Sequence, residues 1–279
     1  MMSRDTRTGE PRWLLNGVPD ALLDPNDRGL LYADGLFETV AFHHRRPPLW
    51  SLHMARLMRG CRELGLPAPD PEQLLNEALT LVGARTRAVV RITLTRGVGG
   101  AGYVPDSTPA APTRLLIRRD FPVGLDQLRE QGLRLFRWPR PLGVAGPAGT
   151  KHLARLQQVL IGSEMRRRNA DEAVVVDAEG YLIEALAGNL VLVRDGRLIE
   201  AEPHPAAVEG VGLAWLRDAA GPTIERARIR IDELRSDDAL WVINSVRGPI
   251  GACTLDGAAM PRDPLIDEWQ RRWLEEIES

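Results

Sequence analysis

The sequence predicts a mixed α/β (α+β) fold in two domains, and three observations support this prediction. A chain of 279 residues is long enough for two domains of ordinary size. Predicted strands dominate, and helices occur between them without the regular alternation of a doubly wound sheet. The pattern breaks at Phe121-Pro122. We therefore expect a smaller N-terminal α/β domain over residues 1–118, a linker over 119–124 and a larger C-terminal domain over 125–279 that carries Lys151.

The N-terminal part is expected to contain a sheet and two helices. Apolar runs and alternating positions predict strands over 12–18, 36–43, 87–95 and 113–118. Asn16-Gly17 is a turn signal near the end of the first strand. One helix is expected over 52–64, with Ser51 as its N-cap and Gly65 at its end, and a second helix over 71–82.

The C-terminal part is expected to be rich in hairpins. Its first elements are a strand over 133–138, a loop of Gly, Pro and Ala over 139–150, and a helix from 152 to about 168. Two hairpins are predicted by turn signals at 178–180 and 195–196, with strands over 172–177, 181–185, 190–194 and 197–200. The last predicted elements are a helix over 212–219, a buried strand over 239–244 and a closing helix over 263–276.

Charge, hydropathy and cysteine content exclude several classes of protein. The net charge of −2 and the pI of about 6.3 provide no broad positive field for nucleic acid or an anionic membrane. No apolar run approaches the ~18 residues of a membrane-spanning helix. Residues 1–5 are polar and lack the apolar core of a signal peptide, so we expect a cytoplasmic protein. The two cysteines and five histidines have no metal-ligand spacing, so no metal site is predicted.

Lys151 is the most informative residue of the chain. It is the only lysine among 36 basic residues, and all the others are arginine. Arginine can replace lysine as a charge, but its pKa above ~12 prevents it from acting as a free amine. The chemistry that requires a free amine is Schiff-base formation with a carbonyl substrate or with pyridoxal phosphate. A catalytic lysine and a chance survivor of a strong arginine bias are both compatible with this composition.

Residues 97–102 match the GxGxxG pattern of dinucleotide-binding proteins and follow a predicted strand. Such a site requires a helix directly after the glycines, whereas Tyr103-Val104-Pro105 and then Pro109 follow here. A glycine-rich loop beside a ligand, or a flexible loop, therefore fits this segment better. A nicotinamide dehydrogenase that uses this loop is the alternative from another class of enzyme.

Glu184 is a candidate partner for a pyridine nitrogen. In a pyridoxal phosphate enzyme, a carboxylate beside the ring nitrogen keeps it protonated and makes the ring a better electron sink. Glu184 lies among apolar residues of segment 181–186, where burial of an unpaired carboxylate would be costly. The alternative is a residue at the edge of a sheet that faces water.

Several segments together resemble the class IV, fold type IV family of pyridoxal phosphate enzymes. They run in the order of the family and extend over residues 16–257. The matching segments are 27–29, 34–39, 53–57, 95–103, 149–160, 169–173 and 184–190. The lysine segment and the glycine loop are the most specific, and within the family they favour the aminodeoxychorismate lyases over the transaminases.

The resemblance implies roles for particular residues. Lys151 matches the Schiff-base lysine, Glu184 the partner of the pyridine nitrogen, and Arg56 the arginine that binds the cofactor phosphate. The further expected cofactor contacts are Asn189, Gly210, Val211 and Ser245. Arg96 and Arg247 are the candidates for binding the carboxylates of a dianionic substrate.

The chain also departs from the family pattern. The departures are Ala101, Ala154, Val191, Glu202 and the region 215–217, where an expected arginine is out of register. They concern the phosphate turn and the substrate, and the cofactor is still expected.

The resemblance implies a small N-terminal α/β sandwich and a larger C-terminal domain with a barrel-like sheet and helices. It implies pyridoxal 5'-phosphate as the cofactor and a homodimer. The implied reaction converts the small molecule 4-amino-4-deoxychorismate to 4-aminobenzoate and pyruvate in folate biosynthesis, with a functional link to aminodeoxychorismate synthase. A D-amino-acid or branched-chain aminotransferase of the same fold and a non-catalytic pyridoxal phosphate-binding protein are the alternatives.

Overall fold

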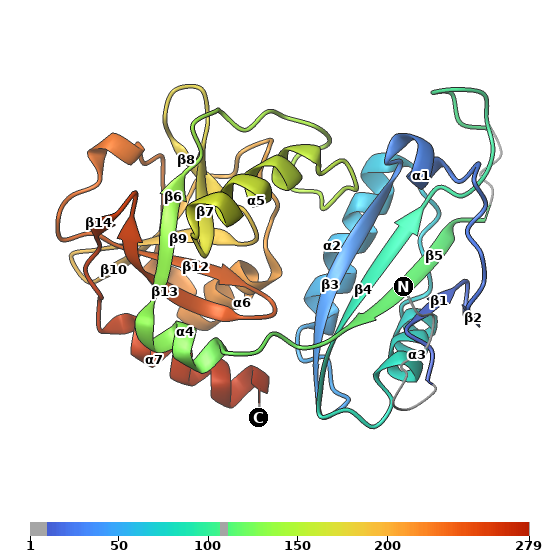
Figure 1. Cartoon of the computed structure of the whole chain (residues 1–279), viewed down its shortest axis with the longest axis horizontal. Helices are drawn as coiled ribbons and strands as arrows, with labels where there is room; N and C mark the ends of the chain where they lie inside the picture. The colour runs from blue at the N-terminus through green and yellow to red at the C-terminus, as the bar shows by residue number, and fades with distance from the viewer. Residues whose placement is uncertain (1–9, 107–110, 279) are drawn as a thin grey trace. The chain divides into compact units, whose positions relative to one another are not determined.

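The computed structural model describes residues 10–106 and 111–278, and in it the chain forms two compact units, each with its own sheet (Figure 1). The first unit contains Met1–Phe121 and Thr150–Ala154, and the second contains Pro122–Gly149 and Arg155–Ser279. The change of unit after Phe121 falls inside the predicted linker. Residues 1–5, on which the expected cytoplasmic location partly depends, lie outside the described residues.

The first unit is an antiparallel sheet with its two longer helices packed on one face. Its strand order is β2-β1-β5-β4-β3, and each neighbouring pair is antiparallel. The strands are β1 (Trp13–Leu15), β2 (Val18–Pro19), β3 (Gly35–His43), β4 (Arg87–Thr95) and β5 (Thr113–Arg119). The helices are α1 (Arg28–Tyr32), α2 (Trp50–Leu64) and α3 (Pro71–Val82).

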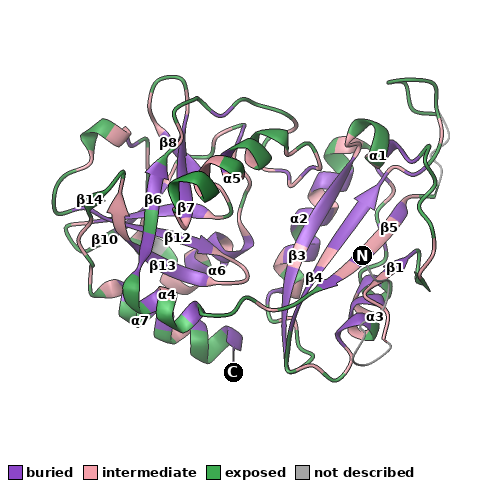
Figure 2. Ribbon diagram, viewed as in Figure 1, coloured by how far each residue is buried: buried purple, intermediate pink, exposed green. Residues whose placement is uncertain are grey.

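The core of this unit consists of side chains on one face of the sheet and side chains of the helices that pack on it. Leu36, Val40 and Phe42 of β3 lie on the same face of the sheet because successive strand residues point to opposite faces. They are buried together with Met54 and Leu57 of α2. Figure 2 shows the strands of this sheet as largely buried. An α/β layer in the N-terminal part is therefore confirmed.

Local signals explain the helix boundaries in this unit, with one correction. α3 begins at Pro71, and the side chain of Asp70 accepts a hydrogen bond from the backbone of its first turn. α2 ends at Gly65, which adopts the left-handed conformation with a φ of 60°. The prediction that Ser51 caps α2 is wrong, because the helix already begins at Trp50 and no side-chain cap is present there.

The second unit is a curled, nine-stranded sheet. The strand order is β11-β10-β9-β12-β13-β6-β7-β8, and β14 pairs with β13. The strands are β6 (Leu133–Arg137), β7 (Glu172–Val176), β8 (Leu182–Ala185), β9 (Asn189–Arg194), β10 (Arg197–Ala201), β11 (Ile224–Ala227), β12 (Ala239–Asn244), β13 (Gly248–Leu255) and β14 (Ala258–Ala259). The two ends of this order approach each other, because Leu182 of β8 donates its N–H to the carbonyl of Ile229, just after β11, at 2.8 Å. The sheet is therefore barrel-like, as expected.

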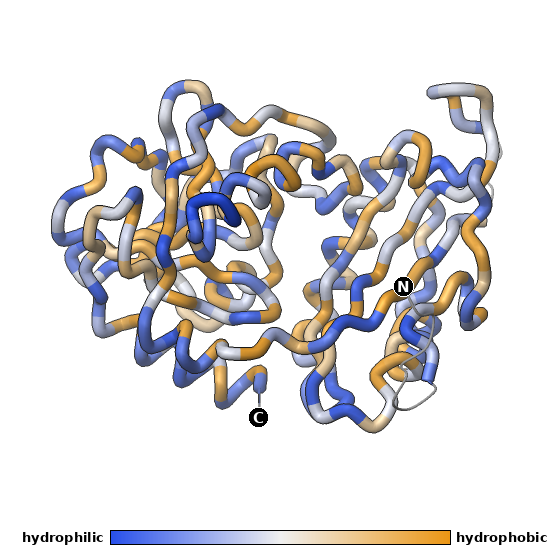
Figure 3. Tube along the Cα trace, in the orientation of Figure 1, coloured by the Kyte–Doolittle hydropathy of each residue, from blue (hydrophilic) through white to orange (hydrophobic). Residues whose placement is uncertain are grey.

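Helices cover the second unit. They are α4 (Leu125–Gln131), α5 (Leu156–Arg168), α6 (Val211–Ala220) and α7 (Leu265–Trp273), with short helical turns at Gly221–Thr223, Ile231–Glu233 and Leu274–Glu278. Figure 3 shows a hydrophilic end of α5. Arg167 and Arg168 form ion pairs there with Glu164, which is the arrangement of a solvated helix end.

The lysine segment differs from the prediction in two ways. α5 begins at Leu156 rather than at residue 152. Thr150–Ala154 instead run along β3, where the N–H of Phe37 donates to the carbonyl of Lys151 at 2.9 Å and the N–H of Leu153 donates to the first residue of β3 at 3.0 Å. These bonds hold the segment out of the helix. They also explain why Lys151 packs with the first unit, whereas the sequence assigned it to the C-terminal domain.

Two further findings concern membranes and metals. Within residues 10–106 and 111–278, no helix is long and apolar enough to cross a bilayer. In the same part of the chain, no group of three or more His, Cys, Asp or Glu side chains is arranged to hold a metal ion.

Candidate functional site

Lys151 lies at the edge of the first sheet. His152 forms a bridge to Leu36, so Lys151 is opposite Phe37 and both side chains extend from the same face. The Nζ of Lys151 lies 4.6 Å from the centroid of the Phe37 ring. The guanidinium carbon of Arg91, on β4, lies 3.8 Å from the same centroid. The only side-chain amine of the protein is therefore placed on an aromatic ring beside a second cation.

Arg56 lies in a buried cluster with two other polar residues. It forms a bidentate ion pair with Glu38 of β3, in which Nε donates to Oε1 at 2.8 Å and Nη2 donates to Oε2. The Nδ1 of His53, one turn before Arg56 on α2, lies 2.7 Å from the same Oε2. The side chains of Glu38 and His53 are each 1% exposed. We call Glu38, His53 and Arg56 the Glu38 cluster.

The charges of the Glu38 cluster follow from its surroundings. Burial raises the pKa of Glu38, but the charge and hydrogen bonds of Arg56 outweigh burial and lower this pKa to about 2. Glu38 is therefore an ionised acceptor at neutral pH, and the proton between it and His53 belongs to Nδ1. Burial lowers the pKa of His53 against the opposing effect of Glu38, and the charges of Arg56 and Lys151 lower it further. Among the described residues, the buried Nε2 of this ring has no hydrogen-bond partner.

Glu184 lies on β8 and is 6% exposed, so the alternative of a residue facing water is wrong. The N–H of Val208 donates to Oε2 of Glu184 at 2.9 Å. Asn189, at the start of β9, donates its side-chain N–H to the carbonyl of Val208 at 3.0 Å. Gly149 also pairs with Val208. One loop residue before α6 is thereby joined to β8, to β9 and to the end of the loop that precedes the lysine.

Two glycines permit close packing at the start of α6. Gly210 is the N-cap residue, and a Cβ there would lie 1.7 Å from Oδ1 of Asn189. A Cβ on Gly212, in the first turn, would lie 2.7 Å from the carbonyl carbon of Asn244. No side-chain cap is present at this helix start in the described chain. Backbone N–H groups of an uncapped first turn, which here begins at Val211, can bind an anion.

The turn after β12 holds two more of the predicted residues, Ser245 and Arg247. The Oδ1 of Asn244 shapes this turn by accepting hydrogen bonds from the backbone N–H groups of Val246 and Arg247, at 3.0 and 2.9 Å. The guanidinium of Arg247 binds the buried Oε2 of Glu172 at 2.6 Å. Arg247 is therefore oriented by an ion pair.

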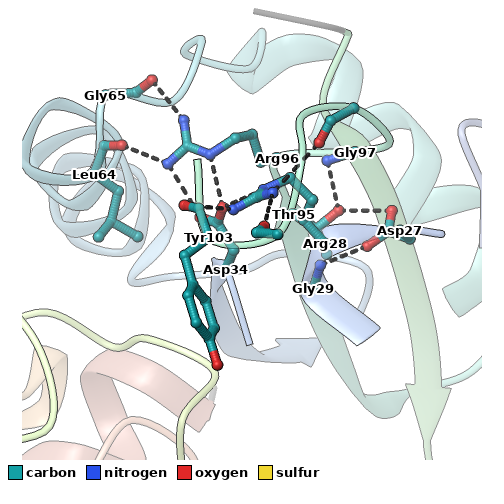
Figure 4. A network of polar contacts seen from close by, with 12 residues as sticks. Asp27, Arg28, Gly29, Asp34, Leu64, Gly65, Thr95, Arg96, Gly97 and Tyr103 are labelled. Carbon is teal, nitrogen blue, oxygen red and sulfur yellow. Dashed lines mark hydrogen bonds and ion pairs between the residues drawn. The ribbon is translucent and has the colours of Figure 1, made fainter. Parts of the chain in front are cut away.

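A network that the sequence did not indicate holds the glycine loop (Figure 4). Arg96 binds Asp34 through Nε and Nη2, at 2.7 and 3.0 Å, and donates to two carbonyl groups at the end of α2. Arg28 binds the same carboxylate at 2.9 Å and donates to carbonyl groups of the loop. Arg96 would have to leave Asp34 to bind a substrate carboxylate. In the described residues between this loop and β5, no helix begins, so a dinucleotide site lacks the helix that it requires.

The predicted site residues belong to two sets. The first unit holds Lys151, Arg56 and Arg96, and the second unit holds Glu184, Asn189, Gly210, Val211, Ser245 and Arg247. In the first unit, Lys151 is near enough to the Glu38 cluster for its charge to lower the pKa of His53. In the second unit, Glu184 and Asn189 are joined through the loop before α6.

Sequence reasoning missed Glu38 and His53 as partners of Arg56. Two signals were present. Glu38 is a carboxylate within a strand of mostly apolar residues, where burial without a partner is costly. His53 and Arg56 are three residues apart on a predicted helix, and residues at this spacing are neighbours on the helix surface.

The chemistry of these residues fits pyridoxal phosphate. Its phosphate suits either a guanidinium fork, such as Arg56 in the first unit, or the N–H groups of a helix start, such as the glycine-lined start of α6 in the second unit. Its aldehyde requires an amine, and Lys151 is the only one on a side chain. Its ring nitrogen requires a buried acceptor such as Glu184. The orphaned Nε2 of His53 can accept a hydrogen bond from a bound group or from water.

Similarity to known proteins supports pyridoxal phosphate as the cofactor. The family model for amino-transferase class IV matches residues 35–253. An aminodeoxychorismate lyase of Vibrio harveyi is 27% identical over 256 residues, which are 90% of this chain and 93% of that protein. A bifunctional aminodeoxychorismate lyase and D-amino acid transaminase of Mycobacterium tuberculosis is 24% identical over 273 residues, with 90% and 91% covered. The crystal structure of 4-amino-4-deoxychorismate lyase from Pseudomonas aeruginosa matches with a TM-score of 0.86 and 33% identity, and covers 96% of this chain and 100% of that chain.

The fold and the family match define a fold type IV pyridoxal phosphate enzyme. The chain belongs to the class IV aminotransferase family, whose model spans most of its length. Pyridoxal phosphate is therefore its cofactor, and a small-molecule substrate fits the family. Lyases and aminotransferases both occur among its relatives.

Proposed function

We propose that this enzyme is a carbon–oxygen lyase that converts 4-amino-4-deoxychorismate to 4-aminobenzoate and pyruvate, in folate biosynthesis. The observation that carries the proposal is the likeness to the Pseudomonas aeruginosa lyase over nearly the whole chain. The lysine segment and the glycine loop support it, because both resemble the lyases more than the transaminases.

The reaction is balanced without an oxidant or a second substrate. The C–H bond at the amine-bearing ring carbon breaks, and so does the C–O bond to the enolpyruvyl group. The leaving group takes the electron pair of the C–O bond and gains a proton, which yields pyruvate. The ring becomes aromatic, and this makes the step effectively irreversible.

Each residue has a distinct role in the proposed reaction. Bound pyridoxal phosphate supplies an electron sink for the cleavage of the C–H bond. Lys151 would hold the cofactor through its Nζ. The free Nζ accepts the proton from the ring carbon, and Lys151 or water returns a proton to the leaving group. Glu184 holds the proton of the pyridine nitrogen, and Arg56 binds the phosphate. Asn189 fixes the loop before α6.

Further groups complete the proposed site. The N–H groups that begin with Gly210 and Val211, together with Ser245, bind the phosphate. Arg247, oriented by Glu172, binds a substrate carboxylate. Arg96 is proposed for the same task only if it exchanges Asp34 for the substrate.

A D-amino-acid aminotransferase is the second candidate. The Mycobacterium tuberculosis relative combines both activities in one protein, and it covers 90% of this chain. This relationship favours a side activity with a D-amino acid.

One assay separates the two candidates. The enzyme is supplied with chorismate, glutamine and an aminodeoxychorismate synthase, and 4-aminobenzoate and pyruvate are measured. We expect equal amounts of both products without an added keto acid. If no 4-aminobenzoate forms while D-alanine or a branched-chain amino acid is deaminated onto 2-oxoglutarate, the aminotransferase takes the place of the lyase.

We also propose a cytoplasmic homodimer that receives its substrate from aminodeoxychorismate synthase. Family resemblance supports the dimer, and the reaction itself supports the link, because the substrate must come from an amination of chorismate. Sedimentation of the purified holoenzyme tests the dimer, and a mass of one chain of 30.9 kDa would contradict it.

A further inference from the structure

We infer that Glu38, together with His53, positions Arg56 so that one particular edge of its guanidinium is presented to the cofactor phosphate. This inference rests on the proposed role of Arg56 as the phosphate-binding residue. Arg56 contacts the cofactor in this account. Glu38 and His53 act through Arg56 and are positioning residues.

The geometry of the ion pair determines which edge is presented. A guanidinium can bind an anion in bidentate fashion through Nε and Nη2 or through Nη1 and Nη2. Glu38 occupies the edge formed by Nε and Nη2, since these two nitrogens donate to its two carboxylate oxygens. We assign the phosphate to the other edge of the guanidinium, which contains Nη1.

Burial and hydrogen bonding make Glu38 a rigid support. Its side chain is 1% exposed, and it accepts hydrogen bonds from Arg56 and from the Nδ1 of His53, which is equally buried. Arginine has a long side chain that loses rotamer freedom when a ligand orders it. A support that already fixes the guanidinium reduces this loss on binding. Because the ionised carboxylate also offsets the charge of Arg56, its contribution is orientation rather than added positive charge.

The experiment compares pyridoxal phosphate with pyridoxal, which has the same ring and aldehyde but no phosphate. Dissociation constants of both are measured by equilibrium titration of the full-length apoenzyme, for the wild type and for Glu38→Gln. The substitution removes the charge of the support and leaves one amide oxygen as an acceptor. We expect the affinity for pyridoxal phosphate to fall about tenfold. The affinity for pyridoxal should change less than about twofold, because pyridoxal cannot use Arg56.

Glu77→Gln is the matched control. Glu77 is also a glutamate of the first unit with a side chain that is only 9% exposed. It also forms an ion pair with an arginine, in which Nη2 of Arg114 lies 2.9 Å from its Oε1. Neither Glu77 nor Arg114 is among the residues proposed to bind the cofactor. This variant should keep the wild-type ratio of the two affinities even if it loses thermal stability.

Arg56→Ala separates failure of the inference from failure of the proposed function. If Arg56→Ala leaves the ratio unchanged, the assignment of Arg56 to the phosphate is wrong. If Arg56→Ala lowers the ratio but Glu38→Gln does not, or weakens both ligands equally, the positioning role is wrong and the assignment of Arg56 stands.

The crystal structure of the wild-type holoenzyme decides the matter if Glu38→Gln does not fold. We expect Nε and Nη2 of Arg56 to remain on Glu38 while Nη1 contacts a phosphate oxygen. An Arg56 that has turned from Glu38 to the phosphate would overturn the inference.

Discussion

Buried carboxylates in this protein are paired with arginine at several separate positions. These pairs are Glu38–Arg56, Glu77–Arg114, Glu172–Arg247, Glu200–Arg217 and Asp238–Arg194. A fork-shaped cation suits a carboxylate, so arginine serves the structural ion pairs throughout the chain. Lys151 contacts the ring of Phe37. Because arginine serves these pairs, a single lysine among 36 basic residues supports the view that this position requires an amine.

Asp34 should make the stability of the glycine-loop network depend on pH. Burial raises the pKa of Asp34, but hydrogen bonds and charges from Arg96 and Arg28 outweigh burial and hold the pKa below its ordinary value of 3.8. Since the folded-state pKa is depressed, the stabilisation is present above pH 3.8 and is lost as pH falls through the lower, folded value. Asp34→Asn should lower the free energy of unfolding by about 1–3 kcal/mol at pH 7.

Urea unfolding at several pH values measures this effect. The difference between the wild type and Asp34→Asn should shrink as the solution is acidified below pH 3.8. A difference that stays constant down to the lowest pH at which both proteins fold would contradict the role given to the Asp34 carboxylate.

Glu184→Gln should separate cofactor binding from catalysis. Glutamine keeps an oxygen that can accept the hydrogen bond of Val208, so the loop before α6 should keep its position. It cannot hold a positively charged pyridine nitrogen as a carboxylate does. We expect cofactor affinity within a few-fold of wild type and a kcat lower by on the order of 100-fold. Wild-type turnover would show that Glu184 only anchors the loop.

The role of a single residue could be predicted where its side chain has distinct chemistry. It was missed where the role depends on a partner that is distant in the sequence. Lys151 stands out because no arginine can replace its amine. Glu184 was predicted as a candidate site residue, but only the structure shows that it is buried. Arg96 looks the same in sequence as any substrate-binding arginine, and only the structure shows that it is held in an ion pair with Asp34. Pairing across strands and helices leaves little trace in one sequence.

At the scale of elements, the start of α6 depends on close packing at Gly212. A Cβ there would lie 2.7 Å from backbone atoms of Asn244, which cannot rotate away as a side chain would. We expect Gly212→Ala to lower the free energy of unfolding by about 1–3 kcal/mol and to weaken cofactor binding. Gly162→Ala on α5 is the control, since its Cβ would meet only a leucine methyl at 3.8 Å. That substitution should be neutral or stabilise by up to about 1 kcal/mol.

Thermal and chemical unfolding of the two apoenzymes compares these glycines. Equal stabilities for Gly212→Ala and Gly162→Ala would show that α6 can move away from β12 without lowering the free energy of unfolding.

Elements with strong local signals were predicted, and those that depend on tertiary partners were not. The helix Pro71–Val82 and the strand Arg87–Thr95 have the predicted bounds, because capping and alternation mark them. β13 (Gly248–Leu255) was missed because it contains two glycines and a proline, which weaken a strand signal. α4 (Leu125–Gln131) was also missed, because it is short and its N-cap residue, Gly124, provides no side-chain cap. α5 begins late because backbone bonds to β3 hold the lysine segment extended.

At the scale of the whole molecule, each unit holds residues that are proposed to contact the cofactor. Pyridoxal phosphate at 100 times its dissociation constant should stabilise the folded protein by about 2.7 kcal/mol. Hydrogen exchange should therefore slow in the lysine segment and α2 of the first unit and also in β8 and the start of α6 in the second. α3 is the internal control, because no proposed contact lies on it. Slower exchange in one unit alone would contradict the contacts proposed for the other unit.

The central claim is that Lys151 carries the cofactor, and reduction of the holoenzyme with borohydride tests it most directly. Reduction converts the link between pyridoxal phosphate and an amine into a stable bond, and peptide mapping then locates the modified residue. Because the chain has one lysine, the pyridoxyl group should be found on the peptide that contains Lys151, and Lys151→Arg should keep the charge but lose both the label and turnover. An unlabelled Lys151 peptide, from protein that had bound the cofactor, would contradict the account.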